Sequence, residues 1–228
     1  SIDTMKEASI SSLASEMKPL GDGWCVLHKL YLDGIPLSSE STASLATAVS
    51  RGGLACLSVS GCLLPCSGVR ALVAANGMHS LNISGNVIDV LTADSVSESL
   101  SSAECQLTTL DMTATGLTDR GATAILAAMG RNKSVTSLSL AGNSIGGRSE
   151  TSIINAIRSN STLTQLNLSF GNLSFKKVIS MVDSMKGSWR NEVLTKLDVS
   201  HNNGLKSDVL EFIREFIPSL IHLNVSLS

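Results

Sequence analysis

The chain has 228 residues, of which 43% are hydrophobic, 16% are charged and 3% are aromatic, and its formal net charge at pH 7 is −2. This composition excludes an intrinsically disordered chain, because disordered chains are poor in apolar residues and rich in net charge. It also lacks the basic surface and the stacking rings that nucleic-acid-binding proteins use, so we expect no nucleic-acid partner.

Targeting signals and membrane spans are not visible in the sequence. No apolar run approaches the roughly 18 residues of a membrane span, and residues 1–12 lack the basic and apolar regions of a secretory signal. Five cysteines, an odd number, favour reduced thiols and a cytoplasmic location. Because the first residue is Ser rather than Met, we expect a fragment of a larger intracellular protein.

Residues 1–26 are expected to form a helical segment that precedes the main pattern of the chain. Ile10, Leu13 and Met17 have helical spacing, and Pro19 would end the helix. Two interpretations remain open: an N-terminal cap, or the helix of a truncated preceding repeat.

Residues 27–228 contain about eight repeats of roughly 28 residues. Each repeat begins with a nine-residue frame in which positions one, four and six are apolar. All 24 of these positions are apolar, and 17 of them are Leu, so the pattern is not an effect of composition. The frames start at Leu27, Leu54, Met78, Leu107, Val135, Leu163, Leu194 and Leu220.

Between the frames, apolar residues three or four apart predict short amphipathic helices. Segments with this spacing are 43–49, 118–134, 151–161, 178–185 and 208–217. Each repeat is therefore expected to be a strand followed by a helix, and such units hide their apolar faces by stacking on one another. Strands lie about 4.8 Å apart and helices about 10 Å apart, so the stack bends. The predicted fold class is an α/β solenoid, a horseshoe with a parallel sheet on its concave face and helices on its convex face.

The segment 107–145 resembles a leucine-rich repeat of the ribonuclease-inhibitor-like subclass, and the resemblance extends over 27–228. Residues that match the family's order are Leu107, Leu110, Leu117, Gly121, Ala122, Ile125, Ala128, Leu138, Leu140, Asn143 and Ile145. Members of this subclass include nucleotide-sensing immune receptors, Ran GTPase-activating protein, tropomodulin and the actin-capping-protein linkers. The resemblance implies a non-enzymatic scaffold that binds a protein partner.

In this family the ninth frame position is usually an Asn or Cys whose side chain turns inward and satisfies backbone groups of the loop. Four repeats fit, with Cys62, Asn86, Asn143 and Asn202. The first, fourth and sixth repeats depart from this pattern, which therefore does not predict the shape of their loops; they have Ile35, Thr115 and Gly171. A shift of one residue would bring Asn172 to the ninth position of the sixth repeat.

Strand alternation places frame positions three, five and seven on the concave face, with position eight at its rim. Most of these side chains are small and polar, but two clusters differ. The first cluster is Lys29, Tyr31 and Asp33, and the second is Phe170, Lys196, Asp198 and His201. We predict that both clusters, with Asp111 between them, contact a protein partner, because exposed aromatic and charged residues anchor interfaces. The alternative is that they are ordinary solvent-exposed residues, with Lys196 and Asp198 forming a weak surface pair.

Catalytic, metal and cofactor sites are not expected. Asp198, Ser200 and His201 contain the residue types of a catalytic triad, but they lie close together in sequence on an open face. The histidines have no metal-binding spacing, and Cys62 is better explained as a ninth-position residue than as a metal ligand with Cys66. No phosphate-binding glycine loop is present.

Other functions and partners remain open. One alternative is a regulator of a small GTPase resembling Ran GTPase-activating protein, although Arg120, Arg131 and Arg148 match no motif of that protein. Another is a regulator of actin assembly resembling the capping-protein linkers. The strand of the eighth frame is expected to have one uncovered edge, which makes it a candidate for self-association.

Overall fold

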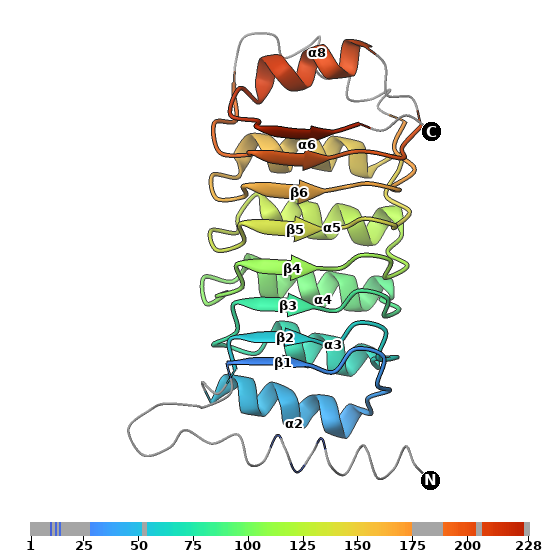
Figure 1. Ribbon diagram of the computed structural model, residues 1–228, viewed down its shortest axis with the longest axis vertical. Helices are drawn as coiled ribbons and strands as arrows, with labels where there is room; N and C mark the ends of the chain where they lie inside the picture. The colour runs from blue at the N-terminus through green and yellow to red at the C-terminus, as the bar shows by residue number, and fades with distance from the viewer. Residues whose placement is uncertain are drawn as a thin grey trace.

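The strands form one open parallel sheet in the computed structural model, which describes residues 10, 12, 14, 28–51, 54–174, 189–203 and 207–225. Each strand pairs with the next one along the chain, from β1 to β8 (Figure 1). The strands are β1 (Lys29–Tyr31), β2 (Cys56–Ser58), β3 (Ser80–Asn82), β4 (Thr109–Asp111), β5 (Ser137–Ser139), β6 (Gln165–Asn167), β7 (Lys196–Asp198) and β8 (His222–Asn224). The predicted α/β solenoid is confirmed.

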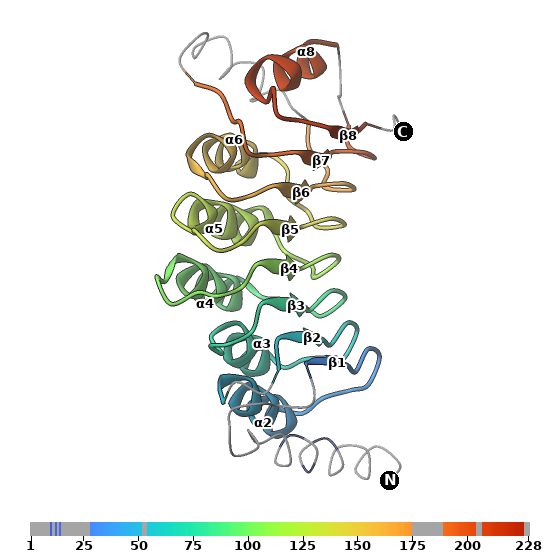
Figure 2. The ribbon, with the colours of Figure 1, turned by 60° about the vertical axis from the view of Figure 1, so that its left-hand side comes forward.

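Helices cover one face of this sheet and leave the other face open (Figure 2). They are α2 (Ser39–Ser50), α3 (Cys66–Val73), α4 (Val90–Ser101), α5 (Asp119–Met129), α6 (Ser149–Ser159) and α8 (Ser207–Phe216). The predicted helical segments 43–49, 118–134, 151–161 and 208–217 overlap helices of the structure. The predicted segment 178–185 lies outside the described residues, as does most of segment 1–26, of which Ile10, Ser12 and Ala14 are helical. The helices α3 and α4 fill the two repeats in which no apolar stripe was identified.

The pairing of the strands follows the nine-residue frame without slippage. Each strand consists of frame positions three to five, and the Leu at position four is level with the same Leu of the neighbouring strand, from Leu30 to Leu223. A slip of one residue would turn these leucines toward solvent, so their burial selects this register. The third and fifth frame positions therefore form two continuous rows on the open face.

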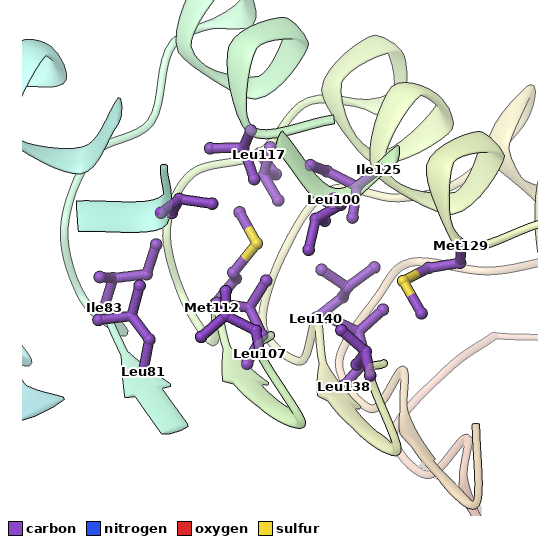
Figure 3. Close-up of a cluster of buried hydrophobic side chains, with 14 of the residues drawn as sticks. Leu81, Ile83, Leu100, Leu107, Met112, Leu117, Ile125, Met129, Leu138 and Leu140 are labelled. Carbon is purple, nitrogen blue, oxygen red and sulfur yellow. The ribbon is translucent and has the colours of Figure 1, made fainter. Parts of the chain in front are cut away.

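The core lies between the sheet and the helices. Frame positions one, four and six are buried in every repeat from Leu54 to Val199. Figure 3 shows these side chains between the two layers, with Leu138 and Leu140 on the side of the strands and Ile125 and Met129 of α5 on the side of the helices. At the two ends of the sheet burial is less complete, and Leu30 and Leu223 at position four are half-buried.

The ninth frame position binds the loop of the preceding repeat. Asn143 accepts hydrogen bonds from the backbone N–H groups of Thr115 and Leu117, at 3.0 Å each, and its amide donates to the carbonyl of Met112 at 2.8 Å. Asn86 and Asn202 are buried with equivalent partners. These bonds satisfy buried polar groups that would otherwise destabilise the loops.

The other ninth-position residues meet the same requirement in different ways. The thiol of Cys62 donates to the carbonyl of Leu32 at 3.1 Å, and burial raises the pKa of that thiol. Thr115 donates through its hydroxyl to the carbonyl of Met112. In the sixth repeat Gly171 itself is buried and Asn172 is exposed, so the suggested shift of one residue is wrong. A Cβ atom on Gly171 would lie 2.8 Å from Ile145, which explains why the larger side chain is excluded.

Candidate functional site

The open face of the sheet is hollowed over β4–β8. The hollow has a volume of about 450 Å³ and is lined by the two rows of side chains at frame positions three and five. Its wall combines carboxylates, amides, an ammonium group and an imidazole, supplied mainly by Asp111, Gln165, Asn167, Lys196, Asp198 and His222. The structure therefore brings Asp111, Lys196 and Asp198 of the predicted contact residues into one surface.

The carboxylate of Asp198 is held by neighbours in the sheet. Its Oδ1 accepts hydrogen bonds from the backbone N–H of Ser200 at 3.0 Å and from the hydroxyl of Ser200 at 2.6 Å. Its Oδ2 accepts from the amide of Asn224 at 3.0 Å. These three donors already orient the carboxylate on the concave face. A partner that binds it would therefore not have to order this side chain.

Position seven of the frame is less exposed than the alternation of the strand predicts. Ala141, Ser169 and Ser200 are buried, although strand alternation predicts that they face solvent. The two serines turn their hydroxyl groups back onto the position-five residues Asn167 and Asp198. The strands end at position five, so strict alternation no longer applies beyond it.

The charged residues Lys196 and Asp198 do not form the weak pair considered above. Within the described residues, one ion pair is present, between Arg120 and Asp94 at 3.8 Å, and both side chains are exposed. The ammonium group of Lys196 is exposed on the face that Asp198 shares. Both charges are therefore available to groups of opposite charge on another molecule.

The geometry of Ser200, His201 and Asp198 is not that of a catalytic triad. The hydroxyl of Ser200 donates to the carboxylate of Asp198, and Ser200 is 3% exposed. A triad would instead place the serine hydroxyl against the histidine ring. The ring of His201 stacks on Phe170.

The stacked pair of Phe170 and His201 lies at the rim of the concave face. The ring centroids are 4.1 Å apart and the ring planes differ by 11°. Phe170 remains 58% exposed, and His201 is exposed as well. An aromatic pair of this kind offers a large and preorganised apolar surface at the edge of the hollow.

Both residues of this pair have a left-handed backbone, with φ of 52° at Phe170 and 54° at His201. They occupy frame position eight, where four other repeats have glycine with positive φ, namely Gly34, Gly61, Gly85 and Gly142. A left-handed conformation costs a bulky residue roughly 1–2 kcal/mol. Burial does not repay this cost, because both rings stay exposed.

The first predicted cluster lies on β1, at the opposite end of the sheet. Tyr31 is 62% exposed, and Lys29 is exposed beside Cys56 of β2. Asp33 accepts hydrogen bonds from the hydroxyl of Ser58 at 2.6 Å and the N–H of Ser60 at 2.8 Å, so it stabilises the loop of the next repeat. The two clusters are thus separate, and Asp33 has a structural role of its own.

Cys56, Cys62, Cys66 and Cys105 are free thiols. No group of three or more His, Cys, Asp or Glu residues could hold a metal ion among the residues with described positions. No helix in that part of the chain is long and apolar enough to cross a membrane.

Comparison with known proteins agrees with the repeat pattern. A family model described as a leucine rich repeat matches residues 105–126, 131–149 and 190–208. These three segments match leucine-rich repeats, and they lie within the α/β solenoid described above. No curated protein sequence matches it.

Among solved structures, the solenoid is similar to a chain in the crystal structure of the Rad7 and Elc1 complex in yeast. The sequence identity is 13%, the TM-score is 0.35, and the match covers 94% of this chain and 78% of that chain.

Proposed function

We propose that the solenoid is a non-enzymatic scaffold that binds a protein partner through its concave face and the rim of the sixth and seventh repeats. The binding surface comprises Phe170, Lys196, Asp198 and His201, with Asp111 at the far side of the hollow. The rigid stack of repeats would hold these side chains in place and so reduce the ordering cost of binding.

The exposed aromatic pair is the observation that carries this proposal. Folding alone favours glycine at frame position eight, yet Phe170 and His201 keep strained backbones there and leave their rings in solvent. Exposed aromatic residues next to fixed charges are typical of the energetic centre of a protein interface.

The proposal is tested with a partner captured on the intact protein, identified by cross-linking and then titrated by calorimetry. We expect Phe170→Ala to weaken this partner at least about tenfold, as truncation of an interface anchor does. Lys196→Glu is expected to weaken it as well, mainly through slower association. Asp198 is unsuitable for charge reversal, because its hydrogen bonds to Ser200 also hold the loop.

Val87→Ala is the matched control. Val87 is an apolar loop residue that is 76% exposed, but it belongs to the third repeat, away from the aromatic pair. Equal affinity of the wild type, Phe170→Ala and Lys196→Glu for the identified partner would refute the proposed surface.

Three further assignments are part of this proposal. The roughly 28-residue repeat with a full helix supports the ribonuclease-inhibitor-like subclass. The free thiols support a cytoplasmic location for the protein. The exposed Ile221, with half-buried Leu223 and Val225, supports self-association through β8, for which sedimentation of Ile221→Lys against the wild type is the test.

A further inference from the structure

The residue that directly follows the nine-residue frame, here called position ten, is exposed in each of the first seven repeats. In repeats four to seven it is small or polar, with Gly116, Ser144, Asn172 and Asn203. In repeats one to three it is apolar instead, with Pro36, Leu63 and Val87. Leu63 is 75% exposed and Val87 is 76% exposed, so packing within the solenoid does not account for these apolar side chains.

Leu91, in the first turn of α4, adds a further exposed apolar side chain four residues after Val87. It is 69% exposed. The residues at the equivalent place in repeats one, two, four and five are polar or charged and also exposed, namely Glu40, Ser67, Arg120 and Arg148. Apolar side chains therefore gather at two exposed places where other repeats have polar ones. The surface formed by Pro36, Leu63, Val87 and Leu91 is called the apolar rim below.

Contacts between neighbouring loops place the residues of the apolar rim side by side. The N–H of Leu64 donates to the side-chain oxygen of Asn86 at 3.0 Å, and these two residues are the chain neighbours of Leu63 and Val87. The loops that follow the strands form the right-hand edge of the molecule in Figure 1, with the first three repeats in its lower half. Isolated apolar residues are common on protein surfaces, but a contiguous group of them marks an interaction site.

The backbone of Leu63 is left-handed, with φ of 51°. Gly116 and Asn172, at position ten of the fourth and sixth repeats, share this conformation with φ of 69° and 58°. Gly and Asn adopt it more readily than a bulky residue does. Leu63→Asn should therefore keep the loop intact while it removes an exposed apolar side chain.

The charges around the apolar rim are mainly acidic. The loops 32–40, 59–67 and 83–91 contain no cation and three exposed carboxylates, those of Asp33, Glu40 and Asp89. The first two turns of α2, α3 and α4 add Arg70 and Asp94, and Asp94 pairs with Arg120 of α5 at 3.8 Å. Four carboxylates and two guanidinium groups give this part of the surface a net charge of −2.

We propose that the apolar rim binds an amphipathic helix of a protein partner, with Lys or Arg beside the apolar stripe of that helix. The three position-ten residues follow adjacent strands about 4.8 Å apart, so they extend over about 10 Å, which matches about two turns of a helix. The carboxylates around the rim attract the cations of such a helix.

Other occupants fit the apolar rim less well. An added β-strand needs free backbone groups, but the loops bond to one another, as the N–H of Gly61 does to the carbonyl of Ser84 at 2.8 Å. An anionic lipid surface would be repelled by the carboxylates. The inference does not depend on the proposed concave site, which lies on β4–β8 and the rim of repeats six and seven. A partner of that site alone does not contact Val87.

The test is a fluorescence anisotropy titration of the full chain with a labelled peptide of about 14 residues, in which Leu and Lys alternate with helical spacing. The test variant is Leu63→Asn with Leu91→Ser, which introduces the residue types of the equivalent positions Asn172 and Ser67 without a change of charge. At physiological ionic strength we expect this variant to lose at least about tenfold in affinity.

The matched control is Ala74→Ser with Ala127→Ser. Both alanines are exposed, and they lie at the C-terminal ends of α3 and α5, away from the loops that follow the strands. We expect this control to bind the peptide within about twofold of the wild type. A second peptide, with Glu in place of every Lys, should bind the wild type at least about tenfold more weakly than the first.

Four outcomes would overturn the proposal. Equal affinity of the wild type and the test variant would show that the peptide binds elsewhere, and absence of binding to the wild type would remove the site. Equal binding of the two peptides would contradict the role of the carboxylates. Binding to vesicles of phosphatidylserine and phosphatidylcholine, lost in the test variant, would assign the rim to a lipid surface instead. Circular dichroism of both variants checks that the fold is intact.

Discussion

At the scale of single residues, frame position eight shows how the side chain affects the strain of a left-handed backbone. Seven successive repeats have a left-handed backbone there, and the residue is Gly, Ala, Phe or His. Gly removes the steric cost of this conformation, whereas any residue with a Cβ retains it. Ala114 therefore carries the same kind of backbone strain as Phe170 and His201, but without an exposed ring.

Reciprocal substitutions at this position test the strain directly. Ala114 has φ of 53° and is exposed, so we expect Ala114→Gly to raise the free energy of unfolding by about 0.5–1 kcal/mol. Gly142 has φ of 66°, and a Cβ there would lie 3.5 Å from Ala114, which is ordinary contact. Gly142→Ala should therefore lower stability by about 1 kcal/mol through strain alone. Urea denaturation measures both, and the same sign for both variants would contradict the interpretation.

We expect a larger loss of stability when a ninth-position asparagine is replaced. Asn143→Ala would leave the N–H groups of Thr115 and Leu117 and the carbonyl of Met112 without their buried partner. Unsatisfied buried groups cost about 1–3 kcal/mol each, so we expect stability to fall by at least about 3 kcal/mol. Asn155→Ala, at an exposed position of α6, is the control and should change stability by less than about 1 kcal/mol. Thermal melting compares the two variants.

At the scale of secondary-structure elements, neighbouring helices are linked by a shared cap. Asp119, in the first turn of α5, accepts the N–H groups of Arg148 and Ser149 at 2.8 Å each, where α6 begins, and also the hydroxyl of Ser149. Burial alone would raise the pKa of Asp119, but the hydrogen bonds from Ser149 and Arg148 outweigh it and hold the pKa below its ordinary value. One carboxylate thus stabilises the N-terminus of the next helix.

The lowered pKa of Asp119 sets the sign of its pH dependence. The carboxylate contributes its full stabilisation above its ordinary pKa of about 4. This contribution is lost as the pH falls through the lower pKa of the folded protein. We expect Asp119→Ala to lose about 1–2 kcal/mol at neutral pH, a loss that vanishes in acid. Asp94→Ala, which breaks the exposed pair with Arg120, should cost less than about 1 kcal/mol. Urea denaturation at several pH values measures the stability of both variants. The same loss of stability and the same pH dependence in both would contradict the proposed cap.

At the scale of the whole molecule, stability depends on the number of neighbours that each repeat has. Leu138 in β5 is 1% exposed, whereas Leu223 in β8, at the same frame position, is half-buried. In a solenoid each repeat contacts the repeats on either side, so repeats at the ends bury less. The middle repeats should therefore resist local unfolding more than the eighth repeat.

Identical substitutions in the middle and at the end quantify this difference. We expect Leu138→Ala to cost about 2–5 kcal/mol as a core truncation, and Leu223→Ala to cost less than about 2 kcal/mol. Hydrogen exchange should show slower exchange for β5 amides than for β8 amides in the wild type. Equal costs for the two substitutions would mean that the eighth repeat is covered as well as the fifth.

Much of the fold was predictable because a leucine-rich repeat encodes its structure locally. The spacing of Leu at frame positions one, four and six determined the strands, their register and the buried face, since a period-two pattern admits one buried side. The positions of Lys196 and Asp198 on the concave face follow from the same alternation. The helices α3 and α4 were not predicted, although their buried apolar residues also have helical spacing, as Val69, Leu72 and Val73 do in α3.

The tertiary structure decided what depends on contacts between repeats. The stacking of Phe170 on His201, the cap from Asp119 to α6 and a buried row of Asn132, Asn160 and Asn191 each join residues that are about 30 positions apart. Sequence spacing determines which face a side chain occupies, but not which hydrogen-bond donor it meets across a repeat boundary. The backbone conformation at position eight likewise follows from the loop that neighbouring repeats hold, because Phe and His would not adopt it alone.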